Sequence, residues 1–153
     1  MSGQIRAEGE LAEHEVANAE SELGAKLPVS YRRFLMSTGG GPLTKAYVLP
    51  EFDGSALLQR FYDARTLVRT QHRAFKEVIP RDYVAVGGGG GGAVCVKVGG
   101  DDVGSVWWAD YDEAEDIGAE GPTQDVMVRQ ADDFSSFLEL VAEQFRVGCE
   151  RDV

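Results

Sequence analysis

Histidine, cysteine and long apolar runs are scarce in this sequence of 153 residues, and each scarcity excludes a class of protein. No apolar run approaches the roughly 20 residues that a membrane-spanning helix needs. The N-terminal stretch is acidic and lacks the apolar core of a secretory signal. With two cysteines there is no disulfide framework of the kind found in small secreted proteins. We therefore expect a cytoplasmic protein that makes no contact with a membrane.

The two cysteines and two histidines offer few candidates for chemistry. Cys95 lies in an apolar run, which favours a buried, inert thiol, although a disulfide to Cys149 stays open at this point. His14 lies among glutamates and His72 in a polar stretch, and neither has a second ligand at metal-binding spacing. Members of a catalytic triad can be far apart in sequence, but no nucleophile motif is present. We expect no catalytic site, no metal and no cofactor.

Lysine and arginine are absent between Val98 and Val128, although the chain contains 15 of them. The same stretch holds nine acids and supplies most of the net charge of −11. Such a surface repels nucleic acids and anionic membranes and attracts basic proteins. We expect a basic protein partner, unless the charge serves solubility alone. The expected contact residues are Asp101, Asp102, Asp110, Asp112, Glu113, Glu115 and Asp116.

Two adjacent tryptophans, Trp107 and Trp108, lie in an expected strand beside the acidic stretch. Neighbouring strand residues point to opposite faces of a sheet, so one ring is expected in the core and the other on the far face. A tryptophan rimmed by carboxylates is typical of a protein-binding anchor, and Trp107 is the expected anchor. The alternative is that residues 44–76 cover the far face and that both rings belong to the core.

Two further motifs resemble ligand sites without meeting their requirements. Six consecutive glycines at 87–92 could cradle a phosphate, but a P-loop or a dinucleotide fingerprint needs a helix after the glycines, and a strand is expected here. We interpret them as a flexible hairpin connection. The D-x-D spacing of Asp110 and Asp112 lacks the glycine and the terminal glutamate of a calcium-binding loop. Acids this dense are commonly just solvated, so a carboxylate pair for glycoside hydrolysis is equally unsupported.

Helical periodicity occurs near both ends of the chain. Apolar residues between 9 and 23 fall on one helix face, and Pro28 is suited to begin a second, short helix that the glycines at 39–41 end. The strongest amphipathic pattern follows Asp132 or Asp133 as the N-cap. Its apolar residues are Phe134, Phe137, Leu138, Val141 and Phe145.

The middle of the chain predicts strands. A strand is expected at 44–49, helical turns at 57–62 and a helix within 64–75. Short runs rich in β-branched and aromatic residues then occur at 83–86, 93–98, 105–109 and 126–129. Short glycine-rich connections between strands favour antiparallel pairing. The prediction is a single α+β domain, with a central antiparallel β-meander and helices from both termini packed on one face.

The order of these features resembles that of the SUKH superfamily, which includes a yeast cell-wall-assembly regulator and many bacterial immunity proteins. The matching segments are an acidic helix, LPVSYRRFL before a glycine cluster, IPRDYVAVGG, AVCVKV, GSVWWADYDE and ADDFSSFLELV. Family members typically carry Asn-Gly-Gly after the second helix, and here Thr38 or Gly39 stands in place of the asparagine. The resemblance implies one such domain over residues 1–153, with its core at about 10–146 and a frayed tail at 147–153.

The resemblance also implies a mode of action. Bacterial members are similar to immunity proteins that bind and neutralise a cognate toxin, often a nuclease or a deaminase, and the family is not known for a catalytic site. The binding surface varies among members, so no binding residue is carried over. We expect a monomer or weak homodimer that neutralises a toxin. A non-catalytic regulator or scaffold is the alternative, and a small-ligand binder, with a deep pocket lined by His72, is a less favoured one.

Overall fold

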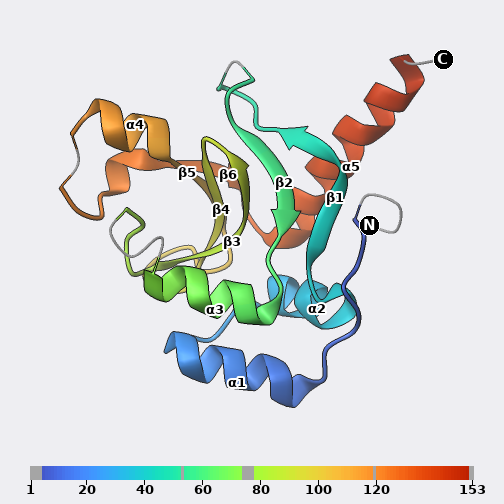
Figure 1. The fold of residues 1–153 in the computed structure, drawn as a ribbon, viewed down its shortest axis with the longest axis vertical. Helices are drawn as coiled ribbons and strands as arrows, with labels where there is room; N and C mark the ends of the chain where they lie inside the picture. The colour runs from blue at the N-terminus through green and yellow to red at the C-terminus, as the bar shows by residue number, and fades with distance from the viewer. Residues whose placement is uncertain (1–4, 53, 74–77, 119, 152–153) are drawn as a thin grey trace.

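A computed structural model describes residues 5–52, 54–73, 78–118 and 120–151 (Figure 1). Within these residues six strands form one sheet, and each strand pairs antiparallel with its neighbour in sequence, which confirms the predicted meander. The strands are β1 (Gly41–Val48), β2 (Leu57–Phe61), β3 (Tyr83–Gly90), β4 (Gly92–Lys97), β5 (Val106–Asp110) and β6 (Met127–Ala131).

Helices from both ends of the chain pack on the same side of this sheet, as predicted. The last helix, α5, passes behind β1 in Figure 1 and contacts β1, β6 and α2. The first helix, α1, packs against α2 and α3 and adds Val16 to the same core. The helices are α1 (Glu13–Leu23), α2 (Val29–Thr38), α3 (Ala64–Arg73), α4 (Tyr111–Asp116) and α5 (Phe134–Arg151).

The main core lies between the sheet and these helices and is rich in aromatic rings. Phe134 of α5 is fully buried and contacts the rings of Tyr31 and Phe34 on α2 and of Phe61 on β2. Trp108 enters the same core from β5. Because this ring joins α5 to both α2 and β2, the aromatic contacts fix how the two helices lie on the sheet.

The opposite face of the sheet carries a second, smaller core built mostly from short side chains. Its centre is Ala85, Ala93, Cys95 and Ala109, covered by α4, by residues 78–79 and by a short 3₁₀ helix at Gln124–Val126. Of the described residues between 44 and 73, only Tyr62 packs against this core, at its margin. Neither α4 nor the 3₁₀ helix is predicted by the sequence analysis.

The glycine cluster at 39–41 ends α2 and also lets the N-terminal segment pack closely against it. Gly39, at φ 70°, caps α2 by donating its N–H to the Leu35 carbonyl. Residues 5–11 then run back along 36–43 through four backbone hydrogen bonds of 2.8–3.0 Å. A Cβ atom on Gly41 would lie 2.1 Å from the Arg6 carbonyl oxygen. Only glycine permits this close approach of two backbones.

Two sequence expectations in the middle of the chain are wrong. Residues 57–61 form strand β2 and not helical turns. A bulge at Gln59 adds one residue to this strand. The extra residue leaves Leu58 and Phe61 buried on one face three positions apart, which imitates helical spacing. The expected flexible connection at 87–92 is also absent: only Gly91 lies between β3 and β4. Gly87 and Gly89 let β2 approach closely, since a Cβ on Gly89 would lie 2.2 Å from the Leu57 carbonyl oxygen.

The boundaries of the last helix differ slightly from expectation. Asp133 is the N-cap, since its Oδ1 atom accepts from the Ser136 N–H at 2.7 Å. The helix continues to Arg151, past the expected end of the core at 146. The expected helix within 64–75 is described as far as Arg73, and its last two positions lie outside the described residues.

Candidate protein-binding surface

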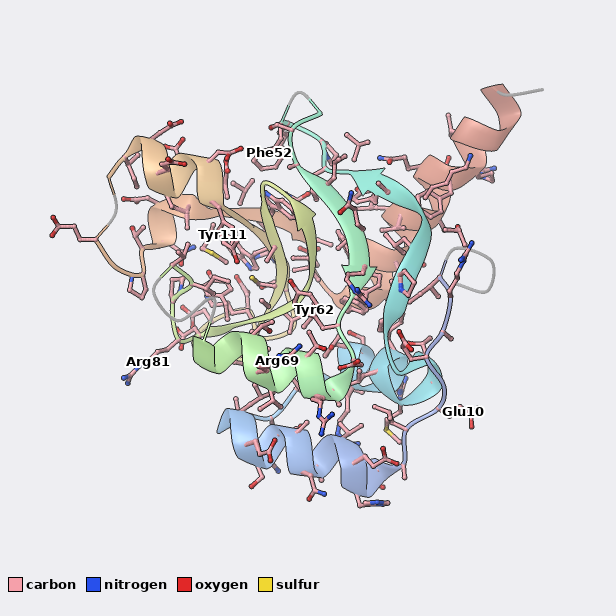
Figure 2. The ribbon with its side chains drawn as sticks, viewed as in Figure 1. Glu10, Phe52, Tyr62, Arg69, Arg81 and Tyr111 are labelled. Carbon is pink, nitrogen blue, oxygen red and sulfur yellow. The ribbon has the colours of Figure 1, made fainter. Side chains whose placement is uncertain are left out.

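The densest acidic group is presented by α4 and its N-cap. Asp110 ends β5 and caps the helix, because its Oδ1 atom accepts from the N–H groups of Asp112 at 3.1 Å and Glu113 at 3.2 Å. Acids in the first turn are favourable at the positive end of the helix. On the inner side, Tyr111 and Ala114 pack against the second core. Tyr111 is labelled in Figure 2. The other side chains, Asp112, Glu113, Glu115 and Asp116, are exposed.

An exposed aliphatic residue adjoins this group. Ile117 follows the last turn of α4 and is 46% exposed. Together Asp110, Asp112, Glu113, Glu115, Asp116 and Ile117 form what we call the helix patch. An apolar centre with a charged rim is the usual arrangement of a protein interface. Sequence reasoning missed Ile117, although an isoleucine directly after an acidic run was a signal that could have identified it.

A second acidic group occupies the turn between β4 and β5. Asp101 and Asp102 are exposed there, and Val103 beside them is 55% exposed. We call these three residues the turn patch. The turn is fixed from within, because Ser105 donates both its N–H and its hydroxyl to the Asp102 carbonyl, at 3.1 and 2.7 Å. The Asp102 carboxylate also forms an ion pair with Arg129 on β6, at 3.3 Å.

The structure does not bring these two groups together. The turn patch precedes β5 and the helix patch begins at Asp110, the last residue of this strand, so the length of β5 separates them. At about 3.3 Å per residue the strand spans about 16 Å. The expected acidic surface is therefore two patches at opposite ends of one strand.

The two tryptophans point to opposite faces, as the strand geometry predicts. Trp108 is fully buried in the main core and Trp107 is half-buried on the opposite face. The Trp107 indole N–H donates to the Ser105 hydroxyl at 2.8 Å. Its ring lies between the cations of Lys97 and Arg129, 6.0 and 5.7 Å from the ring centre. The immediate rim of Trp107 is therefore cationic, and Asp102 reaches it only through Arg129.

The described residues offer little that suggests catalysis. They contain no group of three or more histidine, cysteine or acidic side chains placed to hold a metal. His14 is exposed, and the side chain of His72 lies outside the described part. A groove of about 470 Å³ between α1 and α3 mixes Glu15 and Glu22 with Arg65 and Arg69. None of its lining residues belongs to either acidic patch.

Cys95 is a free thiol buried in the second core. Burial raises its pKa above the usual value, and burial also raises the pKa of the neighbouring Tyr62 to about 12. The reactive thiolate is therefore scarce at neutral pH, and the sulfur is out of reach of solvent.

We expect Cys95 to resist thiol reagents in the folded protein. In a Cys149→Ser variant, native protein at neutral pH should react only as fast as it opens, whereas protein in urea should react at once with one equivalent. Mass spectrometry of the quenched reaction provides the measurement. Rapid labelling of the native variant would contradict the enclosed position of the sulfur.

Comparison of the sequence with known protein families gives a match. Residues 10–140 match the SMI1 / KNR4 family (SUKH-1), a range that includes both acidic patches and all six strands. No curated protein matches the chain. No helix in the described ranges is both long and apolar enough to pass through a membrane.

Proposed function

The chain belongs to the SMI1 / KNR4 family (SUKH-1), and from this premise we propose that it is an immunity protein that sequesters a basic toxin domain. The family fits a non-catalytic immunity or regulatory protein. The toxin is of nuclease or deaminase type, since such enzymes need a basic surface to hold phosphates. We further propose that the protein acts in the cytoplasm, where a free thiol such as Cys95 persists.

The observation that carries this proposal is the composition of the helix patch. The Asp110 cap and four exposed carboxylates precede the exposed Ile117 along α4, and the patch contains no basic residue. Carboxylates on the rim increase the rate of encounter with a cationic surface, and a desolvated aliphatic centre slows dissociation. The turn patch repeats the same combination around Val103 on a smaller scale.

Reversal of the four exposed charges on α4 tests the role of this patch. The variant Asp112→Lys, Glu113→Lys, Glu115→Lys and Asp116→Lys keeps Asp110, so the helix retains its cap. We expect the association rate with the cognate toxin to fall by about 10- to 1,000-fold at low salt, because electrostatic steering is lost. Stopped-flow fluorescence at two salt concentrations measures it, with the toxin taken from a pull-down in the native host.

A control variant carries the same change in net charge at another place. Glu8, Glu10, Glu15 and Glu51 are exposed and lie outside both patches, and their replacement by lysine should slow association far less. An unchanged rate and affinity in the α4 variant would reject the charge argument. A host pull-down that recovers a cell-wall or signalling protein in place of a toxin would favour the regulatory alternative that the family also fits.

A further inference from the structure

The two edges of the sheet are protected to different extents. The outer edge of β1 is covered by the N-terminal segment, which bridges Leu43 through Ile5. Farther along, the side-chain amide of Gln144 on α5 accepts from the Val48 N–H at 2.8 Å and donates to the Val48 carbonyl at 2.9 Å. This amide makes the two hydrogen bonds that a neighbouring strand would make. An unprotected edge is a template for pairing with another chain, and β1 is blocked against it.

The other edge, β6, has no such cover. No strand lies beyond β6 among the described residues. A groove of about 560 Å³ runs between this strand and α5, lined by Gln130 and Ala131 on one side and by Ser136, Glu139 and Leu140 on the other. Leu140 is 45% exposed and supplies an apolar side chain on the α5 wall of the groove. Within β6 itself, the Gln130 side chain donates to the Val128 carbonyl at 3.3 Å.

The charges around the groove favour one kind of occupant. Among the described residues, the groove is lined by the carboxylates of Asp132, Glu139 and Glu143 and by no basic side chain. Arg129 pairs with Asp132 at 2.9 Å, and Arg146 pairs with Glu143. Glu139 has no ion pair with any described residue. A second copy of this chain would bring two such acidic grooves face to face, whereas a segment with one cation would neutralise Glu139.

We propose that β6 and α5 form a docking site at which an extended segment of the partner protein pairs with β6 as an additional strand. The segment carries an apolar residue over Leu140 and a lysine or arginine opposite Glu139. These two side chains are two positions apart, because residues i and i+2 of a strand face the same side. This docking site rests on the proposed function, because the docked segment belongs to the protein partner that the proposed function requires.

A designed peptide tests this site without requiring the toxin. The probe is the blocked peptide Thr-Val-Thr-Leu-Thr-Lys-Thr, which places leucine and lysine two positions apart. Titration into the isotope-labelled full chain should shift the amide resonances of Val128–Ala131, Glu139 and Leu140, with a Kd on the order of 1 mM. A peptide with glutamate in place of lysine should bind several-fold more weakly, and Glu139→Lys should reverse that preference.

Substitutions on the α5 wall supply the control. Leu140→Asp should abolish the shifts on β6, whereas Val29→Asp, at a position that is 66% exposed on α2, should leave them intact. Absence of shifts on β6 at saturating peptide overturns the inference, as does concentration-dependent dimerisation through β6 in sedimentation. If the toxin binds through α4 but the peptide does not shift the amide resonances of β6, the docking site on β6 is rejected and the immunity function is kept. If the peptide binds β6 but the host pull-down recovers no toxin, the immunity function is rejected and the docking site is kept.

Discussion

Replacement of Phe134 by alanine should destabilise the protein by about 3–5 kcal/mol. Its ring is fully buried, with centroid distances of 5.0 Å to Tyr31, 5.0 Å to Phe34 and 5.6 Å to Phe61. Removal of the ring leaves a cavity at the point where α2, α5 and the sheet meet. The expected loss of stability exceeds that from buried area alone, because the edge-to-face ring contacts of Phe134 are lost as well.

Urea denaturation monitored by tryptophan fluorescence measures this loss. Phe134→Leu fills part of the cavity and should be intermediate, and Leu140→Ala, at an exposed site on the same helix, should change the unfolding free energy by less than about 0.5 kcal/mol. A loss below about 1 kcal/mol for Phe134→Ala would contradict the central position of this ring in the core.

Gly92→Ala should cost about 2–4 kcal/mol, although it adds a single methyl group. A Cβ atom at this position would lie 2.0 Å from the Ala109 carbonyl oxygen and 3.0 Å from the Trp108 ring. Gly92 is paired with Asp110 across β4 and β5, so the strands must separate to make room. The indole of Trp108 is enclosed by the main core and is not free to move aside.

The same substitution at two other glycines separates the clash from backbone strain. Gly121 has open space around it and a φ outside the left-handed range, so alanine should be nearly neutral there. Gly24 also has open space but lies at φ 74° as the C-cap of α1, and alanine should cost about 1 kcal/mol there. Comparison of the three variants by thermal denaturation gives the expected order. A Gly92 variant as stable as the Gly121 variant would show that β4 and β5 can separate without cost.

The side chains to be substituted at the proposed binding surfaces lie outside both cores, so binding and stability should be separable. The exposed charges of the helix patch make no contact with the aromatic core, and Leu140 belongs to neither core. The charge-reversal and groove variants are therefore expected to fold normally. Their effects then report on the partner and not on the fold.

The sequence by itself determined the local structure wherever the chemistry was local. Gly24 and Gly39 end helices at left-handed positions, and Asp133 caps α5 through its own side chain. The opposite directions of Trp107 and Trp108 follow from the pleat of a strand. Net charge and its position along the chain are likewise properties of the sequence, and they were sufficient to predict an acidic binding surface.

Only the tertiary structure decided the features that depend on a partner distant in sequence. The bulge at Gln59 lies in the pairing of β2 with β3, and Gly92 is required because of Ala109 on another strand. The length of β5 divides the acidic residues into two patches, and strand pairing places Arg129 and not a carboxylate on Trp107. No short window of sequence contains both members of such a pair, because register and edge position are set by backbone hydrogen bonds that form only on folding.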